Sequence, residues 1–218
     1  MTVKICAVAD SHVCLQNLNP AQIEPVDILT VSGDLTLRGN LKELSLFRQW
    51  VSKQPAKYKV VIAGNHDFCL EDTNSRAEAE TVLGGDGIIY LRDSLAEIMG
   101  LKIWGTPWQP WFHNWAFNLN RGEDIRRKWD LIPEGLDLLL THGPPFGFGD
   151  RTLRGERVGC EDLLSAIKQV EPKVTCFGHI HEDVGEWQIE DLKLINCSIG
   201  YEVGWHDRGV RGPFYFEL

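Results

Sequence analysis

Five of the seven histidines stand directly after short apolar runs, next to glycine, aspartate or asparagine. The donor-bearing segments are Asp10-Ser11-His12, Gly33-Asp34, Gly64-Asn65-His66-Asp67, His142-Gly143 and Gly178-His179-Ile180-His181. Carboxylate, imidazole and amide groups are ligands for hard and borderline divalent metals. One such histidine would more often be an ordinary surface or core residue, but packing needs do not place histidine repeatedly after buried strands. The pattern therefore predicts that these groups converge on one metal site.

The runs before these segments have the composition of buried strands. The clearest is Val60 to Ala63, which is rich in β-branched residues and stops at Gly64. The corresponding runs are residues 3–9, 28–32, 138–141 and 174–177. Open α/β sheets hold their ligands at the carboxyl ends of the strands. We therefore expect the donor groups to lie together at one edge.

Spacing within the segments suggests how the donors are presented. Asp10 and His12 are two residues apart, so an extended segment would project both side chains to one side, and His179 and His181 repeat that spacing. Asp34 stands alone after its strand and is the natural carboxylate to bridge two ions, while Asn65 offers an amide oxygen. The glycines at positions 33, 64, 143 and 178 are expected to allow the tight turns.

The rest of the chain predicts the elements around these strands. Apolar spacing indicates helices over residues 40–53, 75–83, 121–129 and 159–170, the first with Asn40 as its cap. Residues 88–91, 95–99 and 101–104 are expected to add antiparallel strands, and residues 186–189, 192–196 and 214–216 to form a meander. Residues 105–120, with two prolines and no clear period, are expected to form a loop. Together these elements predict an α/β fold of two stacked mixed β-sheets flanked by helices, in one domain spanning residues 1–218.

Composition limits the partners and the compartment. The formal net charge of −9 disfavours binding to duplex nucleic acid, although metal ions could still attract a small anion. Six cysteines without a Cys-x-x-Cys pair are expected to be reduced core residues of a cytoplasmic protein. We expect no signal peptide before the first strand and no membrane span. A homo-oligomer is left open.

The five donor segments, in this order, resemble the signature of the calcineurin-like metallophosphoesterases and cover the chain to residue 181. The resemblance implies the sandwich fold of that family and a dinuclear metal centre. It implies one ion held by Asp10, His12, Asp34 and His181. It implies a second ion held by Asp34, Asn65, His142 and His179. It gives His66 no ligand role.

Longer stretches resemble the MPPED-type branch, which is related to class III cyclic-nucleotide phosphodiesterases. They include Ser32-Gly33-Asp34-Leu35-Thr36, Gly105-Thr106-Pro107-Trp108, Leu131-Ile132-Pro133-Glu134-Gly135 and Thr141-His142-Gly143-Pro144-Pro145. Parts of that branch have a degraded metal site, whereas all seven implied ligands are present here. The protein phosphatases of the superfamily carry Asp where this chain has Leu37. This difference weakens the case for phosphoproteins as substrates and leaves His66 without an assigned hydrogen-bond partner.

We therefore expect a metal-dependent phosphodiesterase for a small phosphoester, with a nucleotide as one candidate, with direct attack by a bridging hydroxide and His66 as general acid. The alternatives are a phosphomonoesterase or nuclease of the same fold, or a non-catalytic binding scaffold. Mn²⁺ is the first expectation for the metal, with iron, zinc and cobalt as alternatives.

Substrate contacts are expected from Asn65, His66, Trp108 and His113. The aromatic loop containing Trp108 could stack a nucleobase or form a lid, and core packing is an equal alternative. One of the arginines at positions 151, 154 and 157 could contact phosphate, although such charges more often form a solvated face.

Overall fold

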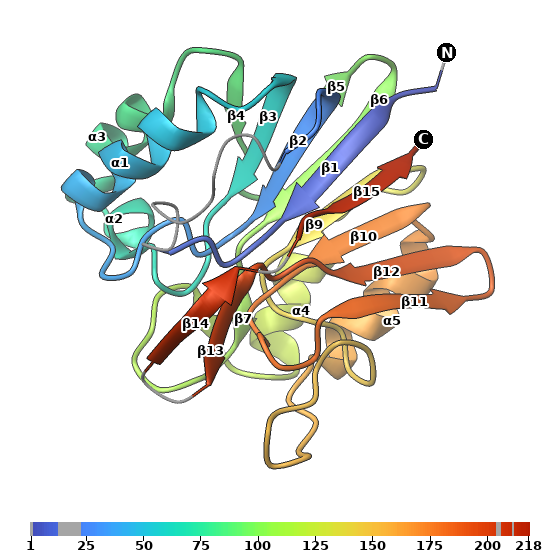
Figure 1. Cartoon of the computed structure of the whole chain (residues 1–218). Helices are drawn as coiled ribbons and strands as arrows, with labels where there is room; N and C mark the ends of the chain where they lie inside the picture. Colours follow the sequence, from blue (N-terminus) through green and yellow to red (C-terminus); the bar gives the residue numbers. More distant parts are fainter. Residues whose placement is uncertain (1, 13–22, 204–205, 211) are drawn as a thin grey trace.

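A computed structural model describes residues 2–12, 23–203, 206–210 and 212–218, and two mixed sheets dominate it (Figure 1). The first sheet has the strand order β15-β1-β2-β3-β4, with bounds Phe214–Glu217, Lys4–Val8, Val26–Ser32, Ala56–Ile62 and Ile88–Tyr90. The second has the order β11-β12-β10-β9-β6-β5, with bounds Gly185–Ile189, Leu192–Asn196, Val174–Phe177, Leu138–Thr141, Leu101–Thr106 and Ser94–Ile98. The predicted pair of mixed sheets is confirmed.

Helices cover the outer faces of both sheets. Beside the first sheet lie α1 (Leu41–Val51), α2 (Phe68–Glu71) and α3 (Arg76–Leu83), and beside the second lie α4 (Glu123–Trp129) and α5 (Glu161–Val170) (Figure 1). One apolar cluster fills the space between the sheets, and two others join each sheet to its helices. This burial of both faces explains why the central strands read as continuous apolar runs. The N-cap prediction for α1 is confirmed, since Asn40 Oδ1 accepts from the backbone N–H of Glu43 at 3.0 Å.

Parallel pairing brings the ends of the central strands to one edge. Strands β1, β2 and β3 are parallel to one another, as are β6, β9, β10 and β12. The two sheets meet at this edge, where the Ala9 N–H donates to the Cys197 carbonyl and the Ile199 N–H donates to the Ala9 carbonyl, at 2.9 and 3.0 Å. The loops that follow the central strands of both sheets therefore lie next to one another at this edge.

Two predicted pairings are wrong. Of the three short strands expected to be antiparallel, β5 and β6 form such a hairpin, but β4 pairs parallel with β3 in the other sheet. The closing meander also fails, because β11 and β12 form a hairpin while β15 crosses to the first sheet and pairs antiparallel with β1. Strand patterns indicate which face is buried and leave the partner open.

Several short elements had no counterpart in the prediction. They are α2, the hairpin of β13 (Gly200–Val203) and β14 (His206–Val210), and the two-residue strands β7 (Gln109–Pro110) and β8 (Asn118–Leu119). Apart from β7, β8 and the end of β6, residues 105–120 form the expected loop.

The cysteines agree with the expectation wherever they are described. Cys6, Cys69, Cys160, Cys176 and Cys197 are free and buried, and Cys14 lies outside the described residues. Burial raises the pKa of Cys6 and of Cys69 to about 12, so both are thiols at neutral pH. Within the described residues, every helix is too short or too polar to cross a bilayer.

Candidate metal centre

The segments after β1 and β10 present their side chains by left-handed turns. The backbone angle φ is 55° at Asp10, 38° at His12 and 68° at His179, and it is also positive, 53°, at Asp34. The expected extended presentation of Asp10 and His12 is therefore wrong. Hydrogen bonds fix the turn instead, since the N–H of Asp10 donates to the Gly33 carbonyl at 3.1 Å and the N–H of His12 to the Asp34 carbonyl at 2.9 Å. Non-glycine residues in this region carry strain, which is typical of functional sites.

The carboxylate of Asp34 stands between imidazoles from three different loops. Its Oδ2 lies 3.7 Å from Nε2 of His12 and 4.0 Å from Nε2 of His66, and its Oδ1 lies 3.4 Å from Nε2 of His142. Each carboxylate oxygen of Asp34 thus has a different set of imidazole nitrogens near it. This is the geometry that a carboxylate shared by two ions requires.

The remaining donors surround this centre. Asp10 Oδ1 lies 3.5 Å from Nε2 of His181, and its carboxylate accepts the backbone N–H of His179 at 2.9 Å. Asn65 Oδ1 lies 2.8 Å from Nε2 of His142 and 2.8 Å from Nδ1 of His179. Ligand atoms within 4.8 Å of one another form three groups, Asp10-His12-His181, His12-Asp34-His66 and Asp10-Asp34-His142. All seven residues predicted as ligands are therefore brought together, and His66 lies beside them.

Hydrogen bonds at the far side of two rings orient their ligand atoms. Nδ1–H of His12 donates to the Thr36 carbonyl at 3.2 Å, and Nδ1–H of His142 donates to the Ser32 carbonyl at 3.0 Å. A carbonyl only accepts, so each neutral ring turns the lone pair of Nε2 to the centre. Nε2 of His12 is buried and has no hydrogen-bond partner among the described residues, and Nε2 of His142 faces the Asn65 oxygen, another acceptor. A cation would satisfy both atoms, so the donor set fits a divalent metal.

The charge states also suit a metal. Burial by itself raises the pKa of Asp10, but the imidazoles of His181, His142 and His12 outweigh it and hold that pKa below its usual value. The pKa of Asp34 is lowered by the same balance, with His142 the largest opposing group. Burial lowers the pKa of His12, and burial with the nearby His142 lowers the pKa of His179 to about 3. Ionised carboxylates beside neutral imidazoles are the forms that bind metals.

Glycine is required here mainly for close approach. A Cβ on Gly178 would overlap the Asp10 carboxylate, and a Cβ on Gly64 would overlap that of Asp34. Gly33 has a φ of +92°, and a Cβ there would meet the His142 ring. Of the four glycines expected to allow turns, only Gly33 adopts a positive φ.

Asp67 is a positioning residue that the prediction missed. Its buried carboxylate accepts the backbone N–H groups of Gly64, Leu35 and Thr36 at 2.8, 3.1 and 2.9 Å, and the Thr36 hydroxyl at 2.7 Å. It thereby ties the loop after β2 to the loop after β3. Its place three residues after Gly64 was a usable signal, because Asp commonly accepts a nearby backbone N–H in turns.

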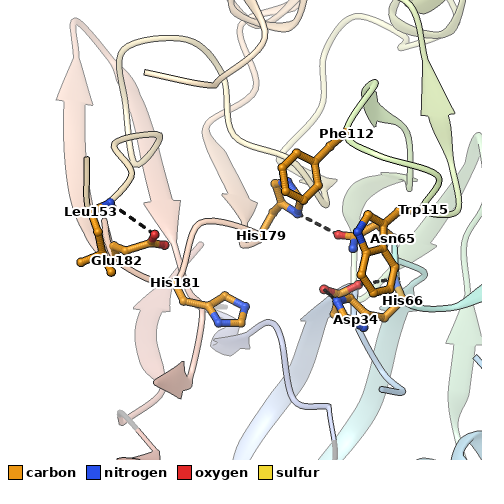
Figure 2. Close-up of a pocket in the computed structure, with 9 residues that line it drawn as sticks. All are labelled: Asp34, Asn65, His66, Phe112, Trp115, Leu153, His179, His181 and Glu182. Carbon is orange, nitrogen blue, oxygen red and sulfur yellow. Dashed lines mark hydrogen bonds and ion pairs between the residues drawn. The ribbon is translucent and has the colours of Figure 1, made fainter. Parts of the chain in front are cut away.

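A pocket of about 300 Å³ opens onto the centre. Its lining includes Asp34, Asn65, His66, His179 and His181 from the centre, and Phe112, Trp115, Leu153 and Glu182 around it. Figure 2 shows Leu153 and Glu182 on one side of this space and Trp115 with His66 on the other. The Trp115 and His66 ring centroids are 4.1 Å apart at an interplanar angle of 33°. Nothing in the sequence pattern indicated Leu153 or Glu182.

The aromatic loop divides between the pocket and the core. Trp108 packs edge-on against Phe117 and donates from Nε1 to the Asp93 carboxylate at 2.9 Å, with the Lys128 ammonium 4.3 Å from its ring. Trp108 therefore packs in the core, and the described residues lining the pocket do not include it. Of the two alternatives for Trp108, the structure favours core packing, because its indole N–H is held by Asp93 and its ring is packed against Phe117.

His113 is exposed and stacks edge-on against Phe112, at 4.4 Å between centroids, without lining this pocket. The three arginines after Pro145 are also outside the lining of this pocket. One of them, Arg157, pairs with the buried Asp150 at 2.6 Å.

The missing partner of His66 is a backbone group. Nδ1–H of His66 donates to the Leu37 carbonyl at 2.7 Å. The ring therefore turns Nε2 toward Asp34 and the pocket. A side chain at position 37 is not needed for this orientation.

Comparisons with known proteins agree with these observations. The family model described as calcineurin-like phosphoesterase matches residues 3–183. The human protein named metallophosphoesterase domain-containing protein 1 is 37% identical over 223 residues, covering 91% of this chain and 68% of its own length. A Caenorhabditis elegans protein of the UPF0046 group is 40% identical over 205 residues, covering 82% of this chain and 52% of its own length. The solved structure of TT1561 of Thermus thermophilus has a TM-score of 0.62 at 15% identity, over 90% of this chain and 89% of that one, which shows a shared fold.

Proposed function

Because the chain belongs to the calcineurin-like phosphoesterase family, in its metallophosphoesterase domain-containing branch, we propose that it is a metal-dependent phosphodiesterase acting on a small phosphoester, with nucleotides among the candidates. Membership of this family supports phosphoester hydrolysis in general, and the preference for a diester is our proposal. The proposal rests on one observation. Three clusters of His and Asp side chains, which share Asp10, Asp34 and His12, form beside the pocket.

We assign the ligands by proximity together with the family pattern. One ion would be held by Asp10, His12, Asp34 and His181. The other would be held by Asp34, Asn65, His142 and His179. Mn²⁺ is our first choice among metals that accept mixed oxygen and nitrogen ligands, followed by iron, zinc and cobalt. When bound, two such ions would polarise the phosphoryl oxygens and make water a nucleophile at neutral pH.

The charges around the pocket favour a phosphodiester. Its described lining contains no lysine or arginine, and it adds the carboxylate of Glu182. Ions carrying about +4 against the two carboxylates Asp10 and Asp34 would leave a positive centre in an acidic protein. Phosphate attraction then depends mainly on the ions, with protonated His66 as a further positive charge in the pocket. Because Glu182 would repel the second negative charge of a monoester dianion, a diester monoanion is the better match.

His66 is placed to act as the general acid. Its side chain is 19% exposed and lines the pocket, and the Leu37 carbonyl fixes Nδ1–H. A proton on Nε2 can therefore be delivered to a leaving oxygen in the pocket, which is a common role for imidazole near neutral pH. Asn65 and His66 are the two predicted substrate contacts that line this pocket.

The free and buried thiols also support our placement of the protein in a reducing compartment, the cytoplasm.

Parallel assays test the function. The chain, loaded with Mn²⁺, would be tested on bis-p-nitrophenyl phosphate, p-nitrophenyl phosphate, cyclic nucleotides and single-stranded DNA, with a chelator-treated sample as control. The proposal expects faster hydrolysis of the diesters, lost on chelation and restored by metal. Preference for the monoester would make the protein a phosphomonoesterase. Metal binding without turnover of any ester would instead indicate a binding scaffold.

A further inference from the structure

A second pocket lies beside the metal centre and shares part of its wall with the first. Its volume is about 310 Å³, at the small end of ligand pockets. Phe112, His179 and Glu182 line both pockets, so the two pockets are neighbours that share the candidate ligand His179. A phosphorus atom held at the centre would therefore have room for one substituent in each pocket.

The second pocket is mainly apolar. Its lining includes Trp111 and Phe112 of the aromatic loop together with the apolar residues Pro144, Val158 and Ile180. Trp111 is 59% exposed and Phe112 is 48% exposed, although both are large apolar side chains. Exposed aromatic groups beside a concave site are typical of ligand contacts.

The charged groups of this pocket do not suit a second phosphate. Arg121 lines it, but Nη1 donates to the Gly159 carbonyl and to Glu161 at 2.7 Å each, and Nη2 donates to the Val158 carbonyl at 2.7 Å. The Glu182 carboxylate adds a negative charge. An anionic substituent would thus meet a cation that is already engaged and the negative charge of Glu182, whereas a neutral substituent would not be repelled.

We infer that this second pocket holds the ester group that remains on phosphorus, and that this group is small, uncharged and flat enough to lie against Trp111 and Phe112. The inference rests on the proposed phosphodiesterase function. In the reaction, water forms the new P–O bond and the P–O bond to the leaving group breaks. The leaving oxygen takes its proton in the first pocket, beside His66. The retained ester group stays in the second pocket, on the product monoester.

A substrate series with one leaving group tests this assignment. Methyl p-nitrophenyl phosphate and phenyl p-nitrophenyl phosphate both release p-nitrophenol and differ only in the retained group. The expected wild-type result is a kcat/KM roughly three- to tenfold higher for the phenyl ester, from aromatic contact and apolar burial. Equal values for the two esters would overturn the inference.

Two variants locate the effect. Trp111→Ala removes an exposed wall and keeps the backbone N–H bond to the Leu119 carbonyl, so it should fold. It should remove the preference for the phenyl ester and change the methyl ester less than about twofold. Val158→Phe, which narrows the pocket, should act in the same direction. Leu131→Ala, another exposed apolar residue outside both described pockets, is the matched control and should change nothing.

A binding measurement separates this inference from the proposed function. Calorimetry with methyl phenylphosphonate and methyl methylphosphonate, two stable monoanions, should show tighter binding of the phenyl compound by wild type and equal binding by Trp111→Ala. If no ester is hydrolysed but this difference is found, the proposed catalysis fails and the subsite stands. If esters are hydrolysed but the phenyl preference survives Trp111→Ala and Val158→Phe, the subsite fails and the phosphodiesterase stands.

Discussion

Replacing His66 by alanine separates its two possible roles. The imidazole lies 4.0 Å from Asp34 and belongs to a group of candidate ligands with His12, yet we assign it proton transfer. If that assignment is correct, His66→Ala keeps both ions and loses the general acid. Loss of a positioned acid lowers turnover by about 10²- to 10⁴-fold, and the full effect applies only when the leaving group needs a proton.

The structure also limits the side effects of this change. The ring is 19% exposed, contacts the Trp115 ring and, in a T-shaped arrangement, the His12 ring, and donates from Nδ1–H to the Leu37 carbonyl. Removing such a partly exposed side chain should lower the free energy of unfolding by only about 1 kcal/mol. A fall in activity would therefore report on chemistry more than on folding.

The assay compares two esters at saturating metal. A cyclic nucleotide, which releases an alkoxide, should lose about 10²- to 10⁴-fold in kcat, and bis-p-nitrophenyl phosphate, whose leaving group departs without a proton, should lose less than about tenfold. Metal content by mass spectrometry should equal that of wild type. His113→Ala, at an exposed histidine of the neighbouring loop, is the control and should leave all three values unchanged. A drop in bound metal would make His66 a ligand, and equal losses on both esters would refute its role as acid.

Three further outcomes are expected. Gly178→Ala should abolish metal uptake in titrations, because its Cβ would overlap the Asp10 carboxylate. Burial and the charge of Asp34 raise the pKa of Asp67 from 3.8 to about 6, so in the metal-free protein its contribution to stability falls as pH rises through that window. In urea unfolding, the free energy of unfolding of the wild type should therefore fall by about 1 kcal/mol between about pH 5 and 7, relative to that of Asp67→Asn over the same range. Chelation should lower Tm, and metal at about 100 times Kd should restore about 2.7 kcal/mol, measured by calorimetry.

The sequence predicted the convergence of the candidate ligands because these donor residues follow buried strands. Apolar runs such as Val60 to Ala63 identify strands, and parallel strands of an α/β sheet end at the same edge. The type and position of the donor residues therefore sufficed to predict that Asp10, His142 and His181 lie close together, although the pairing of the strands was not known. The helices α1, α3, α4 and α5 could be predicted as well, since each carries an apolar stripe on the side that packs against its sheet, whereas α2, with four residues, was missed.

Pairing partners were less predictable, since they depend on contacts between distant segments. Ile88–Tyr90 is a short strand whose side chains are compatible with either sheet, and its place beside β3 is decided by tertiary packing. Phe214–Glu217 likewise joins β1 from the far end of the chain. The left-handed turns at Asp10 and His12 were missed for a related reason, because hydrogen bonds to Gly33 and Asp34 in the loop after β2 hold them.

The orientation of the histidines was beyond prediction for a different physical reason. The rings of His12, His66 and His142 each donate from Nδ1 to a backbone carbonyl, and these carbonyls belong to Thr36, Leu37 and Ser32. All three lie in one segment, residues 32–37 at and after the end of β2, which also carries Asp34. A carbonyl is present at every residue, so residue type carries no sign of this role. The protein phosphatases of the superfamily have Asp at the position of Leu37, and its absence here suggested that His66 lacks a partner. The backbone carbonyl of Leu37 supplies the acceptor that His66 needs, so the Asp side chain is not required.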